Sequence, residues 1–138
     1  MKHDIKMIGM DFDLTLVDYP PSGAYVCPET VACLENLIAQ DVDVGIVTGR
    51  DIWAMRDILT IAGVRFGDPF PTFVVVRENY VHWQKQNKFI AHEPWNSKMT
   101  AQMASFTKSL SSHVQGWLDE LADHGLHPGK WILFSDFG

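Results

Sequence analysis

Four short apolar runs occur along the chain, and a polar loop follows each of them. They cover residues 5–10, 42–47, 72–76 and 131–134. Continuous apolar runs of this length are typical of strands that are buried on both faces, as in parallel sheets. Two further segments, residues 80–83 and 89–92, have the pattern of a β-hairpin that turns around residues 86–88.

Between these runs, apolar residues recur three and four positions apart, which is the spacing of one face of an α-helix. The spacing predicts helices over residues 28–38, 52–61 and 97–122. Pro28 suits the first helical position, Asp51 can cap the second helix, and Gly63 can end it. Strands that alternate with helices predict an α/β fold, namely a three-layer, Rossmann-like parallel sheet with helices on both faces.

Size and charge narrow the class of protein. At 138 residues the chain is as long as one ordinary domain, so we expect a single core domain over residues 1–138. The formal net charge of −6 argues against a surface that coats nucleic acid, because such a surface needs clustered Lys and Arg. The apolar runs are too short to cross a bilayer, and the amino terminus lacks the layout of a signal peptide. The expected location is therefore the cytoplasm, with no membrane partner.

Polar residues gather where the predicted strands end. Asp11 and Asp13 follow the first strand, Thr48 follows the second, and Asp136 follows the last. In open parallel sheets, ligands bind beyond the carboxyl ends of the strands. We therefore expect these four side chains to converge on one crevice.

The segment Asp11-Phe12-Asp13-Leu14-Thr15 resembles the first motif, DxDx[TV], of the haloacid dehalogenase (HAD) superfamily. Thr48, in the sequence IVTGR, is similar to the second motif in sugar-phosphatase-type members. Glu78 and Asn79 resemble the ENG segment of those members, although Tyr80 stands where they have Gly. The resemblance implies a HAD-type core, here with a small β-hairpin and no large cap.

The same resemblance implies a Mg²⁺-dependent phosphatase that acts on a phosphomonoester through an aspartyl-phosphate. A carboxylate that attacks phosphorus is repelled by the phosphate charge, so a divalent cation has to screen the two. Asp11 would be the nucleophile and a metal ligand. Asp13 would protonate the leaving oxygen, activate water and also contribute to the metal site, with Asp136 as a third acidic ligand. Thr48 would donate a hydrogen bond to the phosphoryl group.

A lysine completes the site in the resembling family, and two lysines are candidates here. Lys98 lies at a helix start and is the preferred catalytic lysine. Lys108 lies nearer the usual distance before the fourth motif and is the alternative, as a substrate ligand. Gly49 and Arg50, which follow Thr48 directly, are the other expected substrate contacts.

Several alternatives stay open on the sequence. The family places a second acidic residue shortly after the first in the fourth motif, yet the sequence stops two residues after Asp136. Either the sequence is truncated at this end, or the metal site uses fewer carboxylates. A phosphomutase would keep the same nucleophile, and a noncatalytic metal- or phosphate-binding module would keep the same fold. The substrate and the oligomeric state are not predicted.

Overall fold

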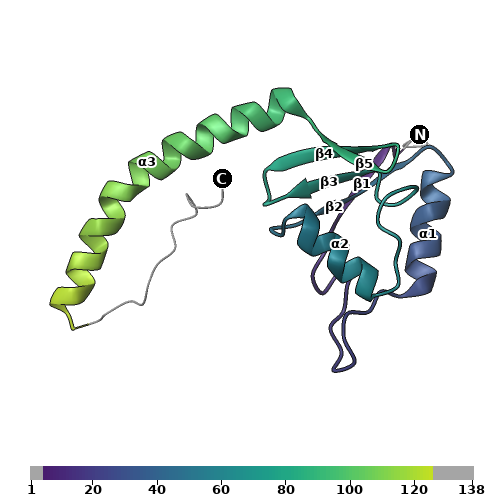
Figure 1. Ribbon diagram of the computed structural model, residues 1–138, viewed down its shortest axis with the longest axis horizontal. Helices are drawn as coiled ribbons and strands as arrows, with labels where there is room; N and C mark the ends of the chain where they lie inside the picture. Colours follow the sequence, from purple (N-terminus) through teal and green to yellow (C-terminus); the bar gives the residue numbers. More distant parts are fainter. Residues whose placement is uncertain (1–4, 126–138) are drawn as a thin grey trace. The chain divides into compact units, whose positions relative to one another are not determined.

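The computed structural model describes residues 5–125 (Figure 1). The chain divides into two compact units, Met1–Asn96 and Ser97–Gly138. The first unit holds a five-stranded sheet and two helices. The strand expected over residues 131–134 lies outside the described residues, and a single domain over residues 1–138 stays a prediction. Within residues 5–125, no helix is both long enough and apolar enough to span a lipid bilayer.

The strands lie side by side in chain order, β1-β2-β3-β4-β5. Their bounds are Met7–Asp11 for β1, Asp43–Val47 for β2, Phe73–Val76 for β3, Tyr80–Lys85 for β4 and Lys88–Ala91 for β5. The first three strands are parallel to one another, as predicted. The predicted hairpin of β4 and β5 is also confirmed, but β4 pairs antiparallel with β3. The hairpin thus extends the central sheet, which is mixed.

Both antiparallel turns contain residues with positive φ angles. Gln86 and Asn87, between β4 and β5, have φ angles of 51° and 61°, the left-handed values that a two-residue hairpin turn requires. Arg77 and Glu78, between β3 and β4, have φ angles of 49° and 60°. The second pair has no glycine to mark it, and for this reason the sequence does not predict that β3 and β4 form a hairpin.

The helices match their predicted positions closely. α1 spans Pro28–Ile38 with Pro in its first turn. α2 spans Ile52–Ile61, and the Asp51 side chain caps it by accepting a hydrogen bond of 2.8 Å from the backbone N–H of Ala54. α3 spans Glu93–Asp123, so it begins a few residues before the predicted start near Ser97.

One face of the sheet carries the hydrophobic core. Val44 and Ile46 of β2 and Val74 of β3 are fully buried and share this face by strand alternation. Leu34 of α1 and Met55 of α2 belong to the same buried cluster. Both helices of the first unit pack against this face. Strands added in one direction through right-handed crossovers place successive helices on the same side.

Part of the opposite face of the sheet is formed by glycines and aromatic residues. Gly9 of β1 and Gly45 of β2 are register partners on this face. The Phe73 ring lies so close to Gly45 that a Cβ there would be 2.3 Å from Cζ of the ring. Phe73 also packs against Trp83, with ring centroids 5.3 Å apart. Asp11, two residues after Gly9, points to this same face.

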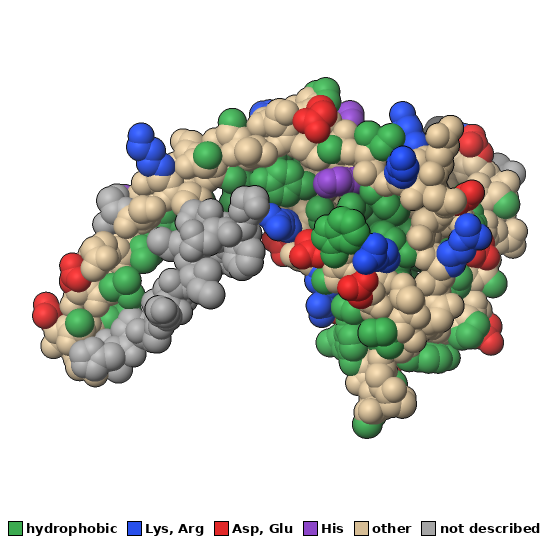
Figure 2. All heavy atoms as spheres, viewed as in Figure 1, with side chains coloured by type: hydrophobic (Ala, Val, Ile, Leu, Met, Phe, Trp, Pro, Cys, Tyr) green, Lys and Arg blue, Asp and Glu red, His purple; other side chains and the backbone are tan. Residues whose placement is uncertain are grey.

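The first turn of α3 is bonded to β4 within the first unit. The Asn96 side chain is buried, its Nδ2 donates to the Val81 carbonyl at 2.9 Å, and its Oδ1 accepts from the Val81 N–H at 2.9 Å. Trp95 Nε1 donates to the carbonyl of Asn79 at 2.7 Å. On the face of the sheet-bearing unit that Figure 2 shows, Lys and Arg side chains are interspersed with Asp and Glu side chains.

Candidate active site

A tight loop directly after β1 positions the two aspartates. Phe12 and Val17 are fully buried, and the Val17 N–H donates to the Phe12 carbonyl at 2.9 Å. Leu14, at the tip, has a φ angle of 60° and is highly exposed. The buried pair fixes both ends of the loop, so Asp13, which follows Phe12, is displayed outside the core on the side of Asp11.

A pocket of about 500 Å³ opens beside this loop at the carboxyl ends of β1 and β2. Its lining includes Asp11 of β1, Thr48 and Gly49 after β2, and Glu78 from the β3–β4 turn. Gly9, Met10 and Val47 complete the lining. Residues from three separate segments of the sequence thus meet at one place, as the strand-end pattern leads us to expect.

Thr15 orients the carboxylate of Asp11. Thr15 Oγ1 donates to Asp11 Oδ2 at 3.1 Å. The Asp11 side chain is exposed to the pocket. Because Thr15 bonds Oδ2, the other carboxylate oxygen, Oδ1, is free of this contact and can face a ligand.

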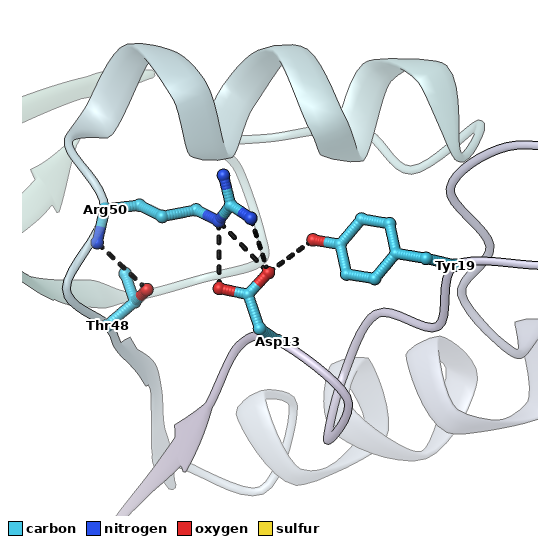
Figure 3. Close-up of polar contacts among 4 residues, drawn as sticks. All are labelled: Asp13, Tyr19, Thr48 and Arg50. Atoms are coloured by element: carbon cyan, nitrogen blue, oxygen red, sulfur yellow. Dashed lines mark hydrogen bonds and ion pairs between the residues drawn. The ribbon is translucent and has the colours of Figure 1, made fainter.

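The Asp13 carboxylate is held by two side chains from other segments (Figure 3). Arg50 Nε donates to Oδ1 at 3.0 Å and to Oδ2 at 2.9 Å, and Nη2 donates to Oδ1 at 2.8 Å. Tyr19 Oη donates to Oδ1 at 2.5 Å. The hydrogen bond from Arg50 holds the pKa of Asp13 below its usual value, with a smaller contribution from Tyr19. Burial and the bond to Asp13 raise the pKa of Tyr19, so its hydroxyl remains a donor.

Thr48 lines the pocket. The residue is buried, and its N–H donates to the Val75 carbonyl at 2.9 Å. Its Oγ1 accepts a hydrogen bond of 3.2 Å from the backbone N–H of Arg50, as Figure 3 shows. The hydroxyl oxygen is therefore used as an acceptor, which leaves its hydrogen for donation to a ligand.

The β3–β4 turn is bonded to the segment that follows β2. The Glu78 N–H donates to the Thr48 carbonyl at 3.0 Å, and the Arg77 N–H donates to the Arg50 carbonyl at 3.0 Å. These bonds bring the Glu78 side chain to the pocket wall. The ENG-like sequence singles out Glu78, but nothing in the sequence assigns it to this wall.

The remaining predicted site residues belong to the second unit. Lys98 and Lys108 are on α3 in the second unit, and Asp136 lies outside the described residues. Within residues 5–125, no group of three or more His, Cys, Asp or Glu side chains could hold a metal ion. Tyr19 is the site residue that the sequence does not indicate. The sequence feature that could have pointed to this residue is its position shortly after the segment that carries the two aspartates.

No family model matches the chain, and no curated protein matches it. Among solved structures, it is similar to a haloacid dehalogenase-like hydrolase from B. subtilis, with 22% identity and a TM-score of 0.48, over 78% of this chain and 34% of that one. It is also similar to yhjK, a haloacid dehalogenase-like hydrolase protein from Bacillus subtilis, with 17% identity and a TM-score of 0.47, over 79% of this chain and 46% of that one. This chain thus spans less than half the length of either protein.

Proposed function

We propose that this chain is a HAD-type hydrolase core that cleaves phosphomonoesters through an aspartyl-phosphate on Asp11. The observation that carries the proposal is the position of Asp11 at the end of β1. Thr15 orients its carboxylate, and it shares a pocket with the hydroxyl of Thr48. Asp11 supplies the nucleophile, Thr48 a hydrogen-bond donor for the phosphoryl group, and Asp13 a second carboxylate.

In the first step, Asp11 Oδ1 attacks phosphorus. The new Asp11–phosphorus bond forms as the bond from phosphorus to the ester oxygen breaks, and Asp13 gives its proton to the departing oxygen. In the second step, Asp13 takes a proton from water, the water oxygen bonds to phosphorus, and the bond to Asp11 breaks. Inorganic phosphate and an alcohol are the products, and both aspartates return to their starting states.

Arg50 links binding of the substrate to the protonation state of Asp13. While Arg50 bonds Asp13, the carboxyl group is held ionised, which is the form that the second step needs. An anionic substrate attracts the same guanidinium, and movement of Arg50 toward it removes the largest cause of the lowered pKa of Asp13. Loss of that contact raises the pKa of Asp13 and so favours the protonated form that the first step needs.

Magnesium is part of the proposal, and the donor set suits it. Mg²⁺ prefers oxygen ligands and is held by one or two carboxylates together with water and substrate phosphate. The Asp11 carboxylate and the backbone carbonyl of Asp13 would hold the ion, because the Asp13 side chain is bonded to Arg50. Asp136 remains the proposed third ligand, and Lys98, or else Lys108, the proposed lysine. When bound, the ion screens the repulsion between the nucleophile and the phosphate.

The test is release of phosphate from p-nitrophenyl phosphate by the full chain, with Mg²⁺ and then with excess chelator. We expect release that depends on Mg²⁺ and that falls by about 10³-fold or more in Asp11→Asn, because the nucleophile is lost. Asp57→Asn is the matched control, since Asp57 is an exposed aspartate on α2 that pairs with Arg56. Equal release by the two variants would contradict the proposal.

Two other outcomes separate the alternatives. Binding of Mg²⁺ or phosphate without any release would identify a noncatalytic module. Transfer of the phosphoryl group to a sugar hydroxyl, detected by product analysis, would identify a phosphomutase.

The segment between Thr15 and α1 contains only isolated bridges and no helix. No folded cap is formed by this segment, and the proposed substrate is a large or projecting phosphorylated molecule, or one enclosed by a partner chain that acts as a lid.

A further inference from the structure

Tyr19 is held firmly in the loop that follows the two aspartates. Backbone hydrogen bonds of 2.8 and 2.9 Å join Asp18 and Tyr25 across the base of the loop. Val17 and Val26, next to this pair, are buried in the core. The Tyr19 N–H also donates to Asp18 Oδ1 at 2.8 Å. Its hydroxyl is therefore presented to Asp13 from a tethered backbone, although the side chain lies at the surface.

The contact makes the two oxygens of Asp13 unequal. Oδ1 accepts from Tyr19 Oη and from two nitrogens of Arg50, whereas the bond recorded for Oδ2 within residues 5–125 is the one from Arg50 Nε at 2.9 Å. A carboxylate oxygen has about two lone-pair sites. The acceptor positions of Oδ1 are thus all occupied, whereas Oδ2 can carry a proton and transfer it.

We propose that Tyr19 is a positioning residue that fixes the rotation of the Asp13 carboxyl group and so selects Oδ2 as the oxygen that exchanges protons with the leaving group and with water. This inference rests on the phosphatase activity proposed above. Tyr19 touches neither the substrate nor the nucleophile in this account and acts through Asp13.

Arg50 alone does not fill this role. Its guanidinium bonds Asp13 through Nε and Nη2, and it is also the expected ligand of the substrate anion. When Arg50 turns toward that anion, its hold on the carboxyl group weakens. Tyr19 carries no charge, so an anion does not attract it in the same way. Its contact keeps Asp13 oriented through that change.

The test compares Tyr19→Phe with Tyr25→Phe in the full chain, using p-nitrophenyl phosphate and a simple alkyl phosphate. The parameter kcat/KM reports the steps up to loss of the leaving group. p-Nitrophenolate leaves without a proton, while an alkoxide needs one, and general acid catalysis supplies about 10²–10⁴-fold. We expect Tyr19→Phe to lower kcat/KM for the alkyl phosphate by about tenfold, a part of that range, and to leave p-nitrophenyl phosphate within about twofold.

Tyr25 is the matched control because it lies on the same loop and is half exposed. Tyr25→Phe should leave both substrates unchanged, and equal thermal unfolding midpoints would show that both variants fold. An equal fall for both substrates in Tyr19→Phe, or no fall for either, would overturn the role of Tyr19 while the phosphatase stands. Absence of Asp11-dependent release in the unmodified chain would instead overturn the phosphatase, and the role of Tyr19 with it.

Discussion

Arg50 and Asp13 form the most specific polar contact of the site. The two residues are 37 positions apart, and three hydrogen bonds of 2.8 to 3.0 Å join them. Both side chains are more than a third exposed. The ion pair therefore contributes more to the orientation of the two side chains than to the stability of the fold. A guanidinium offers two parallel donors to a carboxylate, and an ammonium group cannot reproduce that geometry.

Arg50→Lys should therefore impair catalysis while the fold is kept. Lysine retains the positive charge but loses the forked contact, so the phosphate of the substrate loses a planar partner with two parallel donors. We expect kcat/KM for p-nitrophenyl phosphate to fall by about tenfold or more. Arg56→Lys is the control, since Arg56 pairs with its exposed neighbour Asp57 on α2. Equal activity of both variants would show that charge alone is needed at Arg50.

The sequence predicts which residues form the site better than it predicts which of their side chains contact one another. Asp11 and Asp13 are indicated by the DxDxT pattern after an apolar strand, and Thr48 by its place after the next strand. Arg50 is indicated as a substrate contact, whereas in the structure it bonds Asp13. Contacts between loop side chains depend on how the loops are folded, so neither this bond nor that of Tyr19 can be read from spacing.

The packing of β2 against β3 depends on a glycine. Gly45 has no room for a side chain, because the Phe73 ring occupies the space above it. Phe73 is itself nearly buried on this face and packs against Trp83. The apolar run of residues 42–47 predicts a buried strand correctly. It does not predict that an aromatic ring from the next strand packs directly over Gly45.

Gly45→Ala should destabilise the first unit by about 1–3 kcal/mol, the usual cost of an overpacked site. The added Cβ would come within 2.3 Å of the Phe73 ring, and the ring cannot yield without disturbing its contact with Trp83. Chemical unfolding followed by circular dichroism measures the change. Phe73→Leu combined with Gly45→Ala completes a double-mutant cycle. If the two changes add without coupling, the ring is not the obstacle.

Element positions follow from the sequence because apolar periodicity reports burial directly. The boundaries of α1 and α2 agree with the predicted start signals at Pro28 and Asp51. The antiparallel pairing of β3 with β4 does not follow, because the turn at Arg77 and Glu78 uses positive φ angles without glycine. The tertiary bonds from this turn to Thr48 and Arg50 stabilise a conformation that its own sequence does not favour.

At the scale of the whole molecule, the chain comprises two units that meet in the sequence at Asn96 and Ser97. The described part of the candidate site is formed by the first unit alone. The apolar spacing of α3 predicts a long helix but not its attachment. That attachment is polar, through the Asn96 amide and the Trp95 indole, and such bonds have no periodic signature in a sequence.

Asn96→Ala should loosen β4 and the first turn of α3. The Val81 carbonyl also accepts from the His92 N–H, but the Val81 N–H loses the partner that Asn96 Oδ1 provides. An unsatisfied donor in a partly buried strand costs about 1–3 kcal/mol. Hydrogen exchange of the Val81 amide should quicken accordingly, with smaller increases at the neighbouring residues of β5. Gln102→Ala, an exposed change on α3, should leave these rates unaltered. Slow exchange at Val81 in Asn96→Ala would mean that pairing with β3 and β5 alone fixes this strand, and that Asn96 serves the helix only.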